Sequence, residues 1–182
     1  MPLPRGLRKR CERILAELTL PTPFTIDEFR ASLEAHRGRP IVMEPLPELG
    51  PDAPCGLWIA LPSLDVVFYE QHTSPAHQDL IKLHELGHVI CGHTGVFDLS
   101  RLTALLPDLT PELVGQAMAS GRTSYRTVEE QEAEMIALLL ADLVEADAET
   151  AGKDPGAGAG VAHRLAESLL HPVRPLRRWR KR

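Results

Sequence analysis

The stretch His84-Glu85-Leu86-Gly87-His88 is the most informative part of this sequence, and it lies in a run that predicts a helix. On a helix, His84 and His88 are one turn apart along the axis and about 40° apart around it. Both rings can therefore reach one metal ion. Glu85 lies about 60° round the helix from His88, which places a carboxylate beside the metal without making it a ligand. This H-E-x-x-H arrangement is the one that zinc hydrolases use.

The helix around the motif has clear ends. Ser74-Pro75 predicts its start, because serine is a common N-cap and proline is favoured at the first helical position. Gly92 predicts its end. Gly87 is unusual, because a glycine inside a helix costs about 1 kcal/mol relative to alanine. We expect it either to admit a strand or loop close to the metal face or simply to be tolerated.

Composition indicates one globular domain with appendages. The chain has 182 residues, 43% hydrophobic residues and a net charge of −5, so it is long enough to bury a sizeable core and is not basic overall. Three cysteines at positions 11, 55 and 91 form no disulfide framework. We find neither a signal peptide nor an apolar run that could span a membrane, so we expect a cytoplasmic protein with no membrane contact.

The expected elements combine helices with a small sheet. Thr25 and Glu28 form a capping box that opens one of the helices. Residues 96–125 are expected to form short helical pieces and turns. The other predicted elements are helices over 5–20, 25–36, 74–92 and 128–146 and strands over 41–43, 56–61 and 65–69.

The C-terminal part of the chain differs in composition from the rest. Residues 151–160 are rich in glycine and alanine and predict a flexible linker. Residues 161–182 predict a short helix followed by a basic tail. Six of the last nine residues are basic: Arg174, Arg177, Arg178, Arg180, Lys181 and Arg182.

Two histidines do not hold a catalytic zinc ion firmly, so a third protein ligand is expected. His93 follows His88 by five residues, about 140° round a continuing helix, which predicts a surface or helix-end histidine. The acidic run from Glu129 to Glu134 offers better candidates. A capping box at Thr127 accounts for the first glutamates of this run, but it does not account for Glu134, which lies beside the apolar centre of the helix.

The motif His84-Glu85-Leu86-Gly87-His88, followed some 40 residues later by Glu130-Gln131-Glu132-Ala133-Glu134-Met135-Ile136-Ala137, resembles the ImmA/IrrE family of bacterial metallopeptidases. The match covers roughly residues 40–145. The family usually has asparagine where this chain has Glu134 and phenylalanine where it has Ile136. Its usual proline after the leucine pair is also absent here.

The resemblance implies an α+β, gluzincin-like (zincin-like) metallopeptidase domain over residues 1–150, mostly helical, with a two- or three-stranded sheet packed on the motif helix. It implies Zn²⁺ as cofactor, with His84, His88 and Glu130 as ligands and Glu85 as general base. Glu134 is expected beyond the ligands, accepting a hydrogen bond from the far nitrogen of a ligating histidine. Glu132 remains an alternative ligand.

The resemblance further implies hydrolysis of a peptide bond in a specific protein partner, a helix-turn-helix transcriptional repressor. An extended substrate is expected to pair with one of the strands at 56–61 and 65–69. Tyr125, His72, His77 and His93 are open candidates for stabilising the oxyanion. The alternative is a non-proteolytic regulatory module that keeps the zinc fold and docks to a regulator, or to DNA through the basic tail.

Overall fold

The computed structural model describes residues 6–46, 54–61, 63–93 and 127–150. The chain is of the α+β class, as predicted. The expected short helices over 96–125, the linker and the basic tail lie outside the described residues. In chain order the described elements are α1 (Leu7–Ala16), α2 (Ile26–Arg37), β1 (Ile41–Pro45), β2 (Gly56–Ala60), β3 (Asp65–Tyr69), α3 (Pro75–Cys91) and α6 (Thr127–Thr150).

The three described strands form one mixed sheet in the order β1-β3-β2. β3 lies in the centre, parallel to β1 and antiparallel to β2. In this register Trp58 of β2 lies opposite Val67 of β3. The strand predictions are confirmed, with β1 extending beyond the predicted residue 43 to Pro45.

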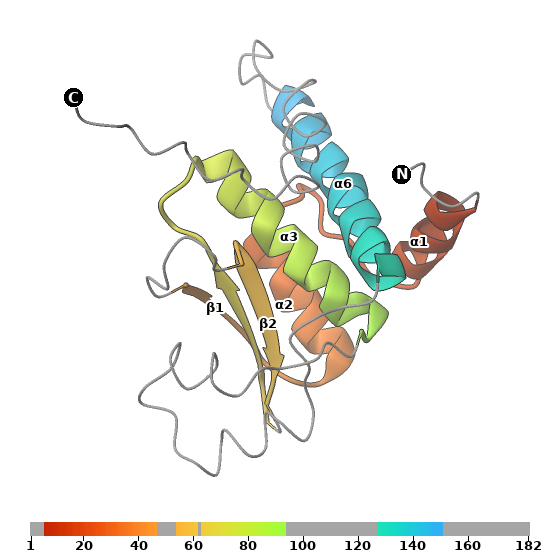
Figure 1. The fold of residues 1–182 in the computed structure, drawn as a ribbon. Coiled ribbons are helices and arrows are strands. Elements are labelled where there is room, and N and C mark those ends of the chain that lie inside the picture. Colours follow the sequence, from red (N-terminus) through yellow and green to blue (C-terminus); the bar gives the residue numbers. More distant parts are fainter. Residues whose placement is uncertain (1–5, 47–53, 62, 94–126, 151–182) are drawn as a thin grey trace, which may run out of the picture.

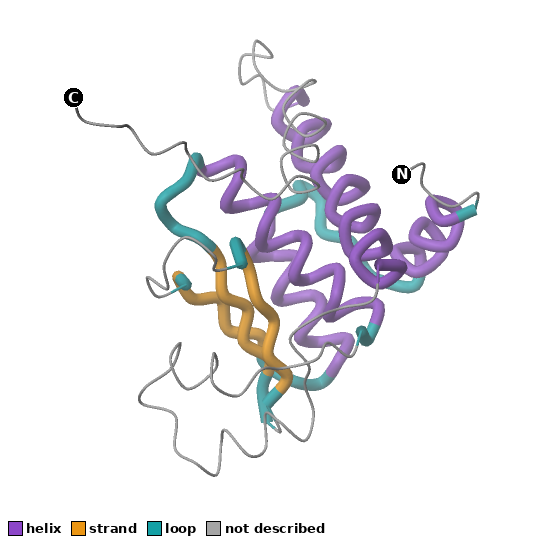
Figure 2. The backbone as a smooth tube through the Cα atoms, in the orientation of Figure 1, coloured by secondary structure: helices purple, strands orange, loops and turns teal. Residues whose placement is uncertain are grey.

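The helices lie on one side of this sheet, as Figure 2 shows. In Figure 1, α3 runs between the sheet and α6, and α1 packs on α6 away from the sheet. The core between these layers is mainly aliphatic. It includes Leu83 and Leu86 of α3 and Ile136 and Leu140 of α6, each at most 1% exposed. The motif helix is therefore covered on two sides.

Local sequence signals set most helix ends. The Thr25 hydroxyl accepts a hydrogen bond from the backbone N–H of Glu28, and the Ser74 hydroxyl accepts one from the backbone N–H of His77. Gly92 ends α3 with φ of 62°, in the left-handed region that favours glycine.

The prediction for the first helix was too long, because α1 ends at Ala16 and not near residue 20. Backbone hydrogen bonds from Glu17 to Ile14 and from Leu18 to Leu15 span three residues each and tighten the last turn, which closes the helix. In contrast, α6 extends beyond its predicted range at both ends. None of the described helices, α6 included, is long and apolar enough to cross a membrane.

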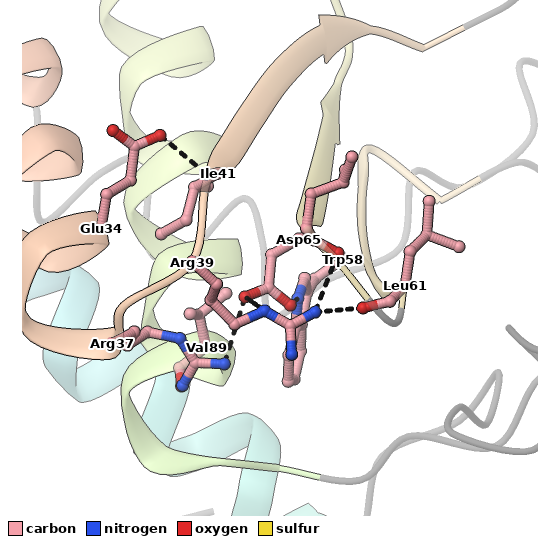
Figure 3. A network of polar contacts seen from close by, with 9 residues as sticks. Glu34, Arg37, Arg39, Ile41, Trp58, Leu61, Asp65 and Val89 are labelled. Carbon is pink, nitrogen blue, oxygen red and sulfur yellow. Dashed lines mark hydrogen bonds and ion pairs between the residues drawn. The ribbon is translucent and has the colours of Figure 1, made fainter.

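A buried polar network, drawn in Figure 3, joins the sheet to the end of the motif helix. Asp65 at the start of β3 is fully buried and accepts hydrogen bonds from Trp58 Nε1 and Arg37 Nη2, both at 3.1 Å. Arg39 forms a second ion pair with the same carboxylate at 3.1 Å. Arg37 also donates to the backbone carbonyl of Val89 at 3.0 Å. The network therefore fixes the C-terminal turn of α3 against the strands.

Candidate metal centre

Three side chains from two helices converge on one point. The Nε2 atoms of His84 and His88 on α3 are 3.1 Å apart. From α6, Glu130 Oε2 lies 3.4 Å from His84 Nε2, and Glu130 Oε1 lies 3.9 Å from His88 Nε2. Ligand atoms of a tetrahedral zinc ion at 2.0–2.1 Å are about 3.3 Å from one another. The three residues could therefore hold a metal ion of this size with small adjustments of the Glu130 side chain.

The approach of α6 to the motif helix depends on a glycine. A Cβ atom at Gly87 would lie 2.8 Å from the carbonyl oxygen of Ala133 and 2.9 Å from its Cα atom. No side chain fits there, because both neighbours are backbone atoms of α6. Of the two expectations for Gly87, close approach is the one observed, and the neighbour is a helix, not the strand or loop considered from the sequence.

The two motif histidines differ in how readily they bind a proton. Burial, together with the nearby His84 and His93, lowers the pKa of His88 to about 2, so this ring is neutral at neutral pH. Burial also lowers the pKa of His84, but the hydrogen bond to Glu130 and the charge of Glu85 outweigh it and raise the pKa overall. A cation between these rings and Glu130 would take the place of that proton.

Glu85 lies beside this group, between α3 and β2. The residue is 5% exposed, and burial raises the pKa of its carboxyl group to about 7, although this group accepts a hydrogen bond from the backbone of Trp58. A Cβ atom at Gly56 would stand 2.6 Å from Glu85 Oε1, so β2 passes closely over the carboxylate. The other oxygen, Oε2, is buried and has no hydrogen-bond partner among the described residues. A buried carboxyl group with a pKa near 7 suits proton transfer at neutral pH.

The other glutamates of the acidic run face elsewhere. Residues two apart on a helix are about 200° apart, and Glu132 accordingly points away from Glu130, toward His93 and Arg10. Glu130 is thus the carboxylate that lies with the two motif histidines. Glu134 is buried, and that burial raises its pKa. Among the described residues, the hydrogen bond predicted from a ligating histidine to Glu134 is not seen: His84 Nδ1 has no hydrogen-bond partner there, and His88 Nδ1 lies beside His93 Nδ1.

The sequence predicted a surface or helix-end histidine at position 93, and His93 does follow the end of α3 directly, but it is buried and not on the surface. His93 is 7% exposed, and its Nδ1 atom lies 2.9 Å from His88 Nδ1. The angle of 140° expected for a continuing helix does not apply, because Gly92 reverses the chain and the backbone N–H of His93 bonds back to the His88 carbonyl at 3.1 Å. The glycine directly before His93 was the signal that could have revealed this.

Of the remaining oxyanion candidates, the two that the structure describes, His72 and His77, are not at this centre. Tyr125 lies outside the described residues. His77 is at the start of α3, about 10 Å along the axis from His84, with its Nδ1 atom 3.0 Å from Thr73 Oγ1. His72 is exposed in the loop before α3.

No protein-family model matches the chain, and no curated protein matches it. One solved structure, a Mycobacterium tuberculosis transcriptional regulator, is similar with a TM-score of 0.37 and 18% sequence identity. The match covers 90% of this chain and 43% of that protein, so the chain spans less than half of its length.

Proposed function

We propose that this protein is a zincin-like, zinc-dependent metalloendopeptidase. The single observation that carries the proposal is the convergence of His84, His88 and Glu130 on one point with the buried carboxylate of Glu85 beside it. Two histidines and a carboxylate, with the fourth position left to water, form the ligand set of catalytic zinc sites. A zinc ion held there would supply Lewis acidity, because it polarises a carbonyl group and lowers the pKa of water to about 7.

The chain's own residues would handle the protons. Glu85, with a pKa of about 7, takes a proton from the attacking water and passes it to the leaving amine of the cleaved peptide. Its location under β2 keeps its carboxylate out of bulk water, which strengthens its interaction with charge developing nearby. His88, held neutral by burial, keeps a lone pair for the metal across the whole working pH range.

The sheet offers a place for an extended substrate. Of the two strands considered from the sequence, β3 is paired on both sides, whereas β2 lies at an edge among the described strands. Gly56 of β2 is next to Glu85, so a peptide added along this edge passes the general base. Backbone pairing of this kind supplies affinity without demanding one particular sequence.

The substrate we propose is a specific protein, a helix-turn-helix transcriptional repressor. This part rests on the resemblance of residues 84–88 and 130–137 to the ImmA/IrrE family. The competing function is a regulatory module that binds the same kind of regulator without cleaving it.

The experiment is to incubate the purified protein with zinc and the helix-turn-helix regulator encoded beside it, and to follow cleavage by mass spectrometry. We expect cleavage by the parent protein and by Glu17→Gln, an exposed control, and at least about 100-fold slower cleavage by Glu85→Gln. An intact regulator that binds the parent and Glu85→Gln equally would refute proteolysis and favour the regulatory module.

A further inference from the structure

A chain of polar contacts leads from the candidate metal centre to the N-terminal helix. His88 Nδ1 lies 2.9 Å from His93 Nδ1, and His93 Nε2 lies 3.1 Å from Glu132 Oε2. Glu132 Oε1 forms an ion pair at 2.8 Å with Arg10 on α1. His88, His93 and Glu132 are all at most 7% exposed, whereas the side chain of Arg10 is 58% exposed. A buried route of contacts thus ends at a surface cation.

Only one arrangement of protons lets this route support a metal ion. For His88 Nε2 to bind a metal, the proton of this neutral ring must be on Nδ1, which then donates to His93 Nδ1. His93 Nδ1 must therefore be the acceptor, and its own proton must be on Nε2, where it donates to Glu132 Oε2. Glu132 accepts as a carboxylate, and Arg10 balances its charge. Each hydrogen bond fixes the direction of the next.

A second metal ion at Cys91, His93 and Glu132 is the competing interpretation, since these residues also place ligand atoms within 4.8 Å of one another. The contacts oppose it. A metal on His93 Nε2 would move the ring proton to Nδ1, so that His88 would have to accept and carry its own proton on Nε2, which removes it from the first centre. Glu132 is also already paired with Arg10.

We propose that His93, Glu132 and Arg10 are positioning residues that hold His88 in its metal-binding tautomer and ring orientation, and so connect α1 to the metal centre. The inference rests on the proposed metal site but not on proteolysis. Residues that hydrogen-bond to metal-ligating histidines in this way typically change metal affinity 10- to 100-fold when they are replaced.

The test uses Zn²⁺ alone as the probe, with affinity measured by competition against a chromogenic chelator. His93→Leu removes the acceptor for His88 and should weaken zinc binding about 10- to 100-fold. His93→Asn keeps an acceptor near the position of Nδ1 and should stay within about fivefold of the parent. A role in stability alone would lower the thermal unfolding midpoint of the metal-free variants alike without separating their zinc affinities, and that result would overturn the inference.

The exposed end of the route gives a variant that does not disturb the core. Arg10→Met should weaken zinc binding about 3- to 10-fold, because Glu132 loses its balancing charge. Arg8→Met is the matched control, since Arg8 lies on the same helix in an exposed ion pair with Glu12, and it should change affinity less than about twofold. Equal affinities of the Arg10 and Arg8 variants would remove Arg10 and α1 from the proposal.

Zinc stoichiometry decides between positioning and a second ion. We expect one zinc ion per chain in the parent and in Cys91→Ala. Two ions in the parent and one in Cys91→Ala would replace the positioning role by a second metal site. A parent protein that binds no zinc would refute the proposed function, whereas normal zinc binding by His93→Leu would refute only this inference.

Discussion

A Cβ atom on Gly87 would stand 2.8 Å from the carbonyl oxygen of Ala133, so the motif helix and α6 touch backbone to backbone at this point. Gly87 is next to His88, and Ala133 is one turn from Glu130. The contact therefore sets the distance between the imidazoles and the carboxylate that complete the candidate metal centre. If α3 and α6 packed further apart, Glu130 could not reach the two histidines.

Gly87→Ala is expected to weaken both folding and zinc binding. The added methyl group gains about 1 kcal/mol of helix propensity, but it clashes with backbone atoms that cannot move without shifting α6. We expect a net loss of about 1–3 kcal/mol in the free energy of unfolding of the metal-free protein, measured in urea. Zinc affinity should fall as well, because Glu130 moves with α6. A variant more stable than its parent would show that the close approach is not required.

Glu130→Gln should lose zinc affinity by at least about 100-fold, more than replacement of a supporting residue costs, because it removes a charged ligand atom. The matched control is Glu129→Gln, one residue earlier in the same acidic turn, which should stay within about twofold. Chelator competition with Zn²⁺ measures both. If Glu132→Gln lowered zinc affinity about 100-fold and Glu130→Gln bound zinc as tightly as the parent, the third ligand would be Glu132.

How much of this centre could be predicted depended on whether the interaction was local. The helix ends at Ser74 and Gly92 follow from cap residues, and the facing of His84 and His88 follows from helix geometry alone. The partner of Gly87 could not be found in this way, because it is a residue 46 positions later in the chain. The ion pair between Arg10 and Glu132 could not be predicted either, because no residue near Arg10 in the sequence indicates that α1 packs on α6.

Glu85→Gln should stabilise the metal-free protein, and only at higher pH. In the unfolded chain this glutamate ionises near pH 4.5, whereas burial keeps it protonated in the folded protein up to about pH 7. The unfolded state therefore binds fewer protons in this window, and stability falls as the pH rises from about 4.5 to 7. Glutamine does not ionise, so the variant should not show this fall. Its free energy of unfolding should exceed that of the parent by on the order of 2–3 kcal/mol at pH 8 and by close to zero at pH 4.

The difference between parent and variant is the quantity to measure, by urea unfolding in the presence of a chelator. His88 has the opposite effect, because its pKa is lowered to about 2 and stability falls as the pH drops below 6.5. This effect is present in both proteins and cancels in the difference. A stability difference that stays constant between pH 4 and pH 8 would contradict the assignment of a raised pKa to Glu85.

Asp65→Asn should destabilise the fold without touching the metal ligands. The fully buried carboxylate faces Arg37 and Arg39, and an amide would leave both guanidinium groups beside a neutral oxygen. Loss of one partner from a buried ion pair costs about 3–5 kcal/mol, and we expect about 2–4 kcal/mol because the two arginine side chains are 24% and 28% exposed. Trp58 can keep its hydrogen bond to the amide oxygen.

Glu12→Gln, which breaks the exposed pair with Arg8, is the control and should cost less than about 1 kcal/mol. The urea midpoint should shift with an unchanged slope, since the loss concerns stability and not the surface exposed on unfolding. Equal midpoints for the two variants would mean that the network in Figure 3 does not hold the end of α3 against the sheet.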